Sequence, residues 1–252
     1  MPKSGTVRRH SGSGRSKPTA RKTGTGKAGR SILCIPGLGG DARLFEPILK
    51  HLDPRIRKRV QYVVLTPPLK RESLARYAKR ILQEQNIAGK AFSLVVGISF
   101  GGAVAQEALK VGTIRSGRAL LVSTAYSGAD TTALTRACAR ILQAFPVVTH
   151  RPIVNSLAAV YPLVRRMKEA KLFAAMFREQ PAGMIFHLPA MIAGWRPESP
   201  GVLPCSFVLV QGTKDPLFSF ANLNRTRTVD VPIARGNHLV CVTEAERIAS
   251  LF

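Results

Sequence analysis

Ser99 stands in a setting that could turn its hydroxyl into a nucleophile. It is the centre of a Gly-Ile-Ser-Phe-Gly run at residues 97–101, which follows the apolar segment 92–96 and precedes small residues that can open a helix. A serine on such a strand-turn-helix elbow is exposed on a sharp turn, and glycines two positions to either side let backbone and helix pass closely. Its place after a strand-like segment strengthens this interpretation. The chemistry that it predicts is attack of an activated hydroxyl on a carbonyl carbon.

Two further residue types are needed to activate that serine, and both follow it in the chain. His238, in a Gly-Asn-His-Leu run at residues 236–239, could take the hydroxyl proton as a general base. A carboxylate would then orient the imidazole ring. Asp215 follows an apolar run at 207–211 and a glycine turn, whereas Asp130 follows another apolar run at 119–123. Either carboxylate could serve.

The elbow, followed in chain order by an acid and a histidine, resembles the α/β-hydrolase family. The resemblance implies an α/β fold with a mostly parallel sheet flanked by helices, and a helical cap inserted before the last strands. It also implies a triad of Ser99 as nucleophile, His238 as base and Asp215 as acid. Asp215 is favoured over Asp130 because its Gly-x-x-Asp-x-x-Phe setting is similar to the family form, although some relatives place the acid where Asp130 lies.

An Ile-Pro-Gly-Leu-Gly-Gly run at residues 35–40 resembles the oxyanion loop of the same family. The resemblance implies that the backbone N–H groups of Leu38 and Phe100 stabilise the oxyanion of the reaction, and that Gly37, Leu38 and Gly39 contact the substrate. Phe100 opens the expected helix, where unpaired N–H groups favour negative charge. Pro36 replaces the histidine that is usual in the family.

The resemblance as a whole implies a serine hydrolase that cleaves a carboxylic ester through an acyl-enzyme, without a metal or an organic cofactor. One alternative is a non-catalytic ligand- or partner-binding protein on the same scaffold, and another is a hydrolase of carrier- or CoA-linked acyl groups. Dehalogenases and epoxide hydrolases that resemble this fold use Asp where Ser99 stands. The His-x-x-x-x-Asp pattern of glycerolipid acyltransferases does not occur in this chain. A perhydrolase or a lyase on the same triad stays open.

Strands and helices that position these residues alternate from Ser31 onwards. Short apolar runs predict strands, and amphipathic segments between them predict helices packed on a mostly parallel sheet. The clearest helix, 73–86, repeats Leu74, Tyr77 and Ile81 at helical spacing. The expected strands are 32–36, 60–65, 92–97, 119–123, 207–211 and 228–233, and the other core helices are 42–52, 100–111 and 243–251.

The alternation lapses between Tyr126 and Pro204, over almost eighty residues, and a stretch of that length must carry structure of its own. We expect a helical cap over 127–204, inserted in a core formed by 31–126 and 205–252. Its helices are predicted at 134–145, 153–161, 164–177 and 183–191, separated by prolines at 146, 152, 162, 181 and 189. Three uncharged apolar stretches, 141–150, 152–164 and 180–195, either line a cavity for a hydrophobic acyl group or pack against the core.

Charge is the unusual feature of the composition. The 252 residues include 38 Lys and Arg against 14 Asp and Glu, which gives a formal net charge of +24. Residues 1–30 hold nine of these basic residues, no acidic one and almost no apolar ones, so we expect a disordered basic tail. A field of this sign attracts nucleic acid, anionic membranes and acidic proteins. The tail has no aromatic residue, so its binding to an anionic surface would be purely electrostatic.

Basic residues also interrupt the expected cap, and between Arg140 and Glu179 the acidic residues are Glu169 and Glu179. From residue 31 onwards the general plan is similar to pimeloyl-acyl-carrier-protein methyl ester esterases, whose substrate rides on an acidic carrier protein. A basic cap would suit docking of such a carrier, which is a second hypothesis about partners. The basic residues concerned are Arg140, Arg151, Arg165, Arg166, Lys168, Lys171 and Arg178.

The cysteines and the amino-terminal sequence bear on the compartment. The four cysteines form no Cys-x-x-Cys pair, and Cys34 and Cys205 fall in or beside strand-like runs, which indicates buried free thiols and a reducing compartment. No apolar stretch suited to a secretory signal follows the first basic residues. The longest uncharged apolar stretch in the expected core, 91–106, is shorter than the roughly 18 residues of a membrane span. We therefore expect a cytoplasmic protein.

Overall fold

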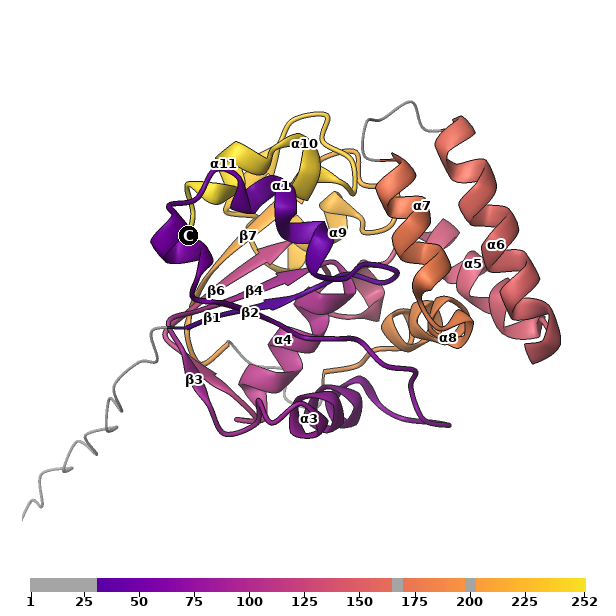
Figure 1. The fold of residues 1–252 in the computed structure, drawn as a ribbon, viewed down its shortest axis with the longest axis horizontal. Helices are drawn as coiled ribbons and strands as arrows, with labels where there is room; N and C mark the ends of the chain where they lie inside the picture. Colours follow the sequence, from indigo (N-terminus) through magenta and orange to yellow (C-terminus); the bar gives the residue numbers. More distant parts are fainter. Residues whose placement is uncertain (1–30, 165–169, 198–202) are drawn as a thin grey trace, which may run out of the picture.

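The computed structural model of the chain describes residues 31–164, 170–197 and 203–252, so the tail predicted over 1–30 lies outside the described residues. Its centre is a six-stranded sheet in the order β2-β1-β4-β6-β7-β8 with every neighbouring pair parallel (Figure 1). This architecture confirms the predicted fold class. The strands are β1 (Ile32–Ile35), β2 (Val60–Tyr62), β4 (Leu94–Ile98), β6 (Arg118–Val122), β7 (Ser206–Gly212) and β8 (Val231–Ile233); the short β3 (Ala91–Phe92) and β5 (Arg115–Ser116) pair with each other.

Helices cover both faces of the sheet because successive side chains of a strand point to opposite faces. Leu33 and Val95 face one apolar cluster, to which α3 and α4 contribute, while Cys34 and Val96 face a second cluster beneath α1, α10 and α11 (Figure 1). The helices of the core are α1 (Glu46–Leu49), α2 (Pro54–Arg57), α3 (Leu74–Glu84), α4 (Phe100–Lys110), α9 (Phe220–Thr226), α10 (Val240–Thr243) and α11 (Ala245–Ala249).

Several predicted elements are shorter or divided in the structure. The helix expected over 42–52 is a 3-10 helix, η1 (Ala42–Phe45), followed by α1, because Pro47 lacks the N–H that would continue the first ladder. The helix expected over 243–251 corresponds to α11, which a separate short helix, α10, precedes, and the strand expected over 228–233 pairs only from Val231. The strand expected over 60–65 ends at Tyr62, since Val64 bonds its N–H and C=O to the side-chain amide of Gln85.

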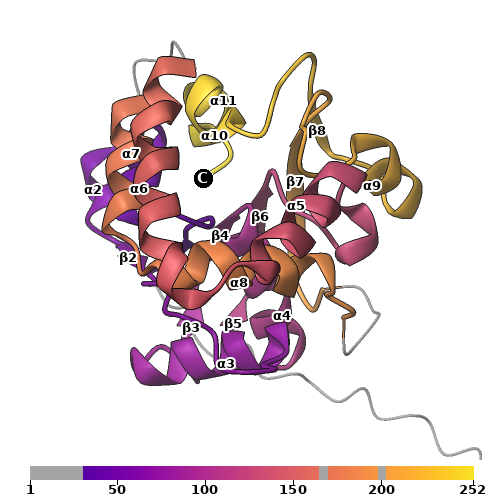
Figure 2. The ribbon, with the colours of Figure 1, turned by 90° about the vertical axis from the view of Figure 1, so that its right-hand side faces the viewer.

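Among the described residues between β6 and β7, four α-helices lie beside the ends of the strands (Figure 2), and we call them the cap helices. The expectation that Pro152, Pro162 and Pro189 separate helices is wrong, because the first two lie within α6 and the third within α8. Each interior proline removes one main-chain hydrogen bond, and packing among the cap helices offsets that loss. The boundaries of a separate cap domain stay a prediction. The cap helices are α5 (Ala133–Ala144), α6 (Val147–Val164), α7 (Ala170–Glu179) and α8 (Ala182–Ala193).

Across residues 31–164, 170–197 and 203–252, no helix has both the length and the apolar character needed to cross a membrane.

Candidate active site

Ser99 occupies a strained turn between β4 and α4. Its φ of +54° and ψ of −121° are unusual for a residue with a side chain, and such strain persists only where surrounding contacts hold it. The Ser99 N–H donates to the carbonyl of Val122 at 2.8 Å, and its carbonyl accepts from Thr124 Oγ1 at 2.7 Å and from the Gly102 N–H at 2.9 Å. The turn is therefore fixed from the neighbouring strand β6.

The glycines of the elbow are required by close backbone approach. A Cβ atom on Gly101 would lie 2.1 Å from the carbonyl oxygen of Ile35, and one on Gly97 would lie 2.5 Å from Gly102 Cα. These distances are shorter than any real Cβ contact, so only glycine lets β4, α4 and the end of β1 meet at this point. The spacing of the motif thus follows from the packing around it.

His238 and Asp215 meet Ser99 at the edge of the sheet where the strands end, which we call the carboxyl edge. His238 Nε2 lies 2.9 Å from Ser99 Oγ, and His238 Nδ1 lies 2.8 Å from Asp215 Oδ2. The Asp215 side chain is fully buried and that of His238 is 16% exposed. Because Nδ1 faces a carboxylate, it carries the ring proton, and Nε2 is left to accept the serine proton. The structure brings together the three residues predicted as a triad.

Asp215 is held by more than the histidine. Its Oδ1 accepts the main-chain N–H groups of Leu217 at 2.8 Å and Phe218 at 3.2 Å. Burial by itself raises the pKa of this carboxyl, but the hydrogen bond and charge of His238, with the two N–H groups, bring that pKa below its ordinary value. The group is therefore a carboxylate at neutral pH and can balance an imidazolium.

Gln211 is a site residue that sequence reasoning missed. It is fully buried on β7, and its Nε2 donates to Asp215 Oδ2 at 2.8 Å, the same oxygen that faces His238. The available signal was a polar residue in an otherwise apolar strand, four positions before the acid. Its amide oxygen is buried without a hydrogen-bond partner among the described residues, so burying this side chain lowers the stability of the fold.

The rival carboxylate, Asp130, has a different environment. Its Oδ2 accepts the N–H groups of Tyr126 at 2.8 Å and Ser127 at 2.9 Å and closes a capping box on the 3-10 helix η2 (Gly128–Asp130). Its main-chain carbonyl accepts the N–H of Ser219 at 2.8 Å. Asp130 therefore organises a turn that supports the segment after Asp215, and it is Asp215 that contacts the histidine.

The predicted oxyanion loop lies against Ser99. A Cβ atom on Gly37 would stand 3.1 Å from Ser99 Cβ, so the loop backbone passes the serine at van der Waals distance. Neither the Leu38 nor the Phe100 N–H donates a hydrogen bond within the part of the chain that the structure describes. Phe100 is the first residue of α4, where such N–H groups have no partner inside the helix. Both N–H groups are available to an anionic oxygen.

The same loop contacts the cap helices. Gly39 has φ +74°, and a Cβ atom there would overlap the ring of Phe177 on α7. The Leu38 side chain packs with Phe177 against an apolar cluster formed by Val154, Ile185 and Phe186 of α6 and α8. The loop thus joins the serine on one side to the cap helices on the other.

An ion-pair cluster also joins the loop region to α7. The Arg43 guanidinium binds both oxygens of Asp41, at 3.0 and 2.5 Å, and it also pairs with Glu179 at the end of α7. Although burial opposes it, the bonds and charge of Arg43 lower the pKa of Asp41. The Glu179 side chain is 59% exposed, so this link contributes little free energy and serves mainly to set geometry.

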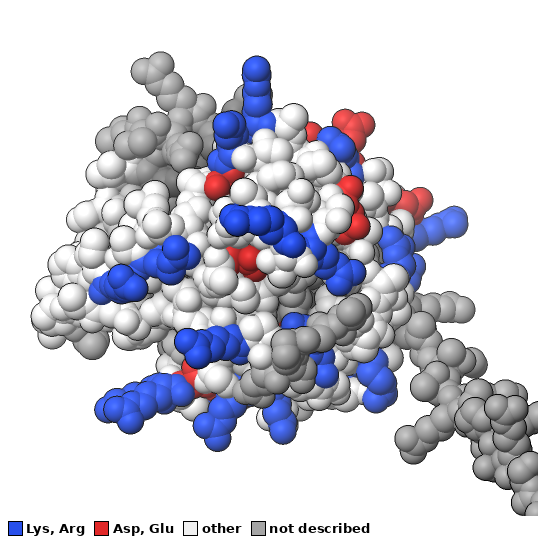
Figure 3. Space-filling view, turned by 180° about the vertical axis from the view of Figure 1, so that it is seen from behind, with Lys and Arg blue, Asp and Glu red and all other residues white. Residues whose placement is uncertain are grey.

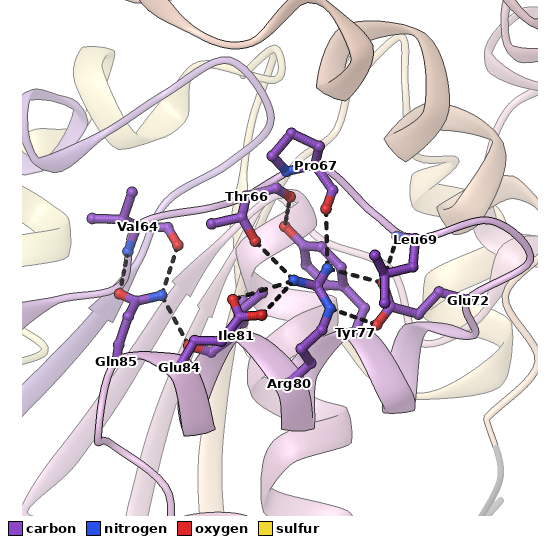
Figure 4. A network of polar contacts seen from close by, with 10 residues as sticks. All are labelled: Val64, Thr66, Pro67, Leu69, Glu72, Tyr77, Arg80, Ile81, Glu84 and Gln85. Carbon is purple, nitrogen blue, oxygen red and sulfur yellow. Dashed lines mark hydrogen bonds and ion pairs between the residues drawn. The ribbon is translucent and has the colours of Figure 1, made fainter.

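A cavity of about 410 Å³ adjoins the oxyanion loop without including Ser99 or His238. Its walls come from η1 and the residues before it, from the segment after β2 and from the end of α7. The segment after β2 is fixed by α3, where Tyr77 and Arg80 bond to Thr66 and Pro67 and Gln85 bonds to Val64 (Figure 4). The lining residues are Gly40, Asp41, Ala42, Arg43, Tyr62, Val63, Val64, Leu65 and Gln180.

The apolar stretches of the cap are partly buried and partly exposed. Val154, Met184 and Leu188 are completely buried, which accounts for much of their apolar character by packing. Other large apolar side chains of α5 and α6 face solvent, with Val148 84% exposed. Of the predicted basic residues, Arg140, Arg151, Lys171 and Arg178 are exposed on the cap helices, while residues 165–169 lie outside the described residues.

The structure tests the prediction that Cys34 and Cys205 are buried free thiols. Cys34 is fully buried, as expected, and Cys205 is half-buried. Burial raises the pKa of both thiols, which keeps them protonated and unreactive. Where side chains are described, no group of three or more His, Cys, Asp or Glu residues is arranged to hold a metal ion.

Comparison with known proteins places this geometry in context. A family model described as the alpha/beta hydrolase family matches residues 32–251, whereas a search of curated proteins found no match. Among solved structures, a thermophilic esterase from Thermogutta terrifontis has 16% sequence identity and a TM-score of 0.61, covering 89% of this chain and 88% of its own. An aryl esterase from Burkholderia cenocepacia has 19% identity, a TM-score of 0.61 and 88% coverage of both chains. An N-acyl homoserine lactonase has 17% identity and a TM-score of 0.60, covering 90% of this chain and 88% of its own.

Proposed function

Because the chain belongs to the alpha/beta hydrolase family, we propose that it hydrolyses a carboxylic ester through Ser99, His238 and Asp215. The observation that carries the proposal is the unbroken hydrogen-bonded chain from Ser99 Oγ through the imidazole to the buried carboxylate, at 2.9 and 2.8 Å. The similar folds of proteins described as esterases and as a lactonase support the same class of substrate.

The proposed reaction proceeds by acyl transfer in two steps. His238 Nε2 takes the Ser99 proton as Oγ attacks the ester carbonyl, and the N–H groups of Leu38 and Phe100 stabilise the oxyanion. The imidazolium, balanced by Asp215, gives its proton to the leaving alkoxide, and an acyl-enzyme remains. Water then attacks the acyl-enzyme with the histidine again acting as base, which releases the acid and restores the serine.

A test of this proposal compares the wild type with Ser99→Ala on p-nitrophenyl esters from acetate to decanoate, with a fluorophosphonate label as a second readout. Ser250→Ala, the same deletion at an exposed serine far from the elbow, is the matched control. Turnover and labelling that disappear only in Ser99→Ala would support the proposal. Absence of both in the wild type would overturn it in favour of a binding protein on this scaffold. Labelling without turnover would indicate a reactive serine in a site that does not accept simple esters.

We also propose that the cavity beside the oxyanion loop receives the end of the substrate remote from the ester. Its volume of about 410 Å³ falls in the range of small-molecule sites. Val64 lines it and is 66% exposed, so Val64→Trp can fill the cavity without disturbing the core. We expect the preference for long over short acyl chains to fall roughly tenfold. Leu69→Trp, an equally exposed position on the same segment that does not line the cavity, should leave that preference unchanged.

An acyl group linked to an acidic carrier protein is a second candidate substrate, favoured by the exposed basic side chains of the cap helices. Arg140, Lys171 and Arg178 are solvent-accessible there. Attraction between exposed charges is screened by salt. The KM for a carrier-linked ester should therefore rise sharply in about 0.5 M salt, whereas the KM for a neutral small ester should hardly change. Salt-independent kinetics on the carrier-linked ester would exclude this candidate.

A further inference from the structure

Exposed basic residues gather where the strands of the sheet begin, at the edge opposite Ser99, which we call the amino edge. Three segments run along it: residues 53–59 before β2, residues 88–93 before β4, and residues 112–118 before β6. Asp53 is their acidic residue, and its carboxylate caps α2 by accepting the Arg55 N–H at 2.6 Å. The exposed basic residues of these segments are Arg55, Arg57, Lys58, Arg59, Lys90, Arg115 and Arg118.

Hydrogen bonds make the three segments neighbours. The Ser93 N–H donates to the Ser31 carbonyl at 2.9 Å, Arg59 Nη2 donates to Ser93 Oγ at 3.2 Å, and the Arg115 N–H donates to the Lys90 carbonyl at 3.0 Å. Since parallel strands are about 4.8 Å apart, the starts of β2, β1, β4 and β6 span about 14 Å. In Figure 1 this edge lies on the left, away from the cap helices, and basic side chains are spread widely over the face seen in Figure 3.

Arg55, Lys58 and Arg115 of this edge are in no ion pair within the described residues. Arginines that are paired with carboxylates, such as Arg43 and Arg80, lie at other places in the fold. Arg57 and Arg115 donate to main-chain carbonyls of Leu52 and Gly89, which orients their guanidinium groups and leaves the positive charge in place. Fixed arginines of this kind suit phosphate oxygens, which accept two N–H groups at once.

We propose that the amino edge binds the phosphate backbone of nucleic acid without reading its sequence. Over about 14 Å a DNA duplex carries roughly eight phosphate charges, a match for a row of basic residues of this length. Residues 1–30, which contain nine basic residues and no acidic one, precede Ser31 in the chain, and Ser31 lies on this same edge. This activity is separate from ester hydrolysis and goes beyond it.

Two other anionic partners fit the edge less well. Binding to a membrane surface usually adds buried apolar side chains to the basic ones, and residues 53–59, 88–93 and 112–118 contain none of the exposed large apolar side chains of the described chain. An acidic carrier protein that delivers a substrate would have to approach Ser99, which lies at the opposite edge. Nucleic acid is therefore the occupant that the charge and geometry favour.

The test uses the full chain and a fluorescein-labelled DNA duplex of about 20 base pairs, with affinity measured by anisotropy between about 50 and 200 mM salt. The edge variant combines Arg55→Ser, Lys58→Ser and Arg115→Ser. The cap variant combines Arg140→Ser, Lys171→Ser and Arg178→Ser and removes the same charge from exposed positions elsewhere. We expect the edge variant to bind at least about tenfold more weakly and its slope of log K against log salt to fall by about two to three, while the cap variant stays within about twofold of the wild type.

Two results would overturn the proposal. Equal affinities for the edge and cap variants would show that net charge, and not this edge, determines binding. Stronger retention of the wild type by vesicles containing phosphatidylserine than by DNA at the same salt would show that the surface serves a membrane. Matching melting curves for the wild type and both variants ensure that a loss of affinity is not a loss of folding.

Discussion

The two edges of the same sheet use polar residues in opposite ways. At the carboxyl edge, Ser99, His238 and Asp215 are partly or fully buried, each bonds to the next, and the serine backbone is held in a strained turn. At the amino edge, the basic side chains are exposed, and Arg57 and Arg115 bond to main-chain carbonyls. Reaction chemistry needs atoms fixed within fractions of an ångström, whereas recognition of a polyanion needs mainly charge in the right place.

The difference between the two edges would be contradicted if removing one oxygen atom at the carboxyl edge lowered kcat/KM less than removing three charges at the amino edge. We expect Ser99→Ala to lower kcat/KM for a p-nitrophenyl ester by a factor on the order of 10⁴ to 10⁶, because no other group in the site can form the acyl-enzyme. The edge variant should keep kcat/KM within about twofold of the wild type, since its residues touch none of the reacting groups. Progress curves with both proteins at equal concentration measure the difference.

Asp215 and Asp130, the two aspartates near the carboxyl edge, should differ in their effects on catalysis and on stability. Asp215→Asn should lower kcat/KM by roughly 10³ to 10⁴, because an amide cannot hold the imidazole tautomer or balance an imidazolium. Asp130→Asn should leave kcat/KM within severalfold but lower the melting temperature, because its carboxylate caps a turn and touches no triad atom. Thermal melts and kinetics on both variants test the assignment, and a large kinetic defect in Asp130→Asn alone would reverse it.

Sequence reasoning was strongest where a local pattern imposes geometry. The elbow, the glycine loop and the segments bearing Asp215 and His238 are each short runs whose spacing reflects backbone approach, and the structure brings them together. It failed where tertiary packing decides, as at Pro152 inside α6, since a missing hydrogen bond does not reveal what packs against the helix. Gln211 was missed because its role depends on the position of the Asp215 side chain, which the residues of β7 alone do not determine.

Gln211 is a buried polar residue of the carboxyl edge that affects the reaction only through its contact with Asp215. In Gln211→Met the Asp215 carboxylate loses one donor and becomes a stronger acceptor for the His238 Nδ1 proton. We expect kcat/KM to fall about tenfold, because a carboxylate with one donor fewer holds the imidazole ring less firmly in place. The acid limb of the pH profile should move to higher pH, because the more basic carboxylate stabilises the imidazolium. Gln211→Glu offers no second control, since it would bury a charge, whereas Gln211→Asn tests whether a shorter amide restores part of the rate. A lower rate with an unmoved pH profile would mean that Gln211 only fills space.

The smallest expected effect is on stability in acid, and it follows from the lowered pKa of Asp215. Below about pH 4 the unfolded chain binds a proton on this carboxyl more readily than the folded chain does, so the free energy of unfolding decreases as the pH falls through the folded-state value. Above that window both states are ionised and the full contribution is present. Asp215→Asn cannot titrate, so the stability difference between the wild type and this variant should narrow between about pH 5 and pH 3 in urea unfolding experiments. A difference that stays constant across this range would mean that the folded protein does not favour the carboxylate, and the network around Asp215 would then lack the electrostatic role that the triad requires.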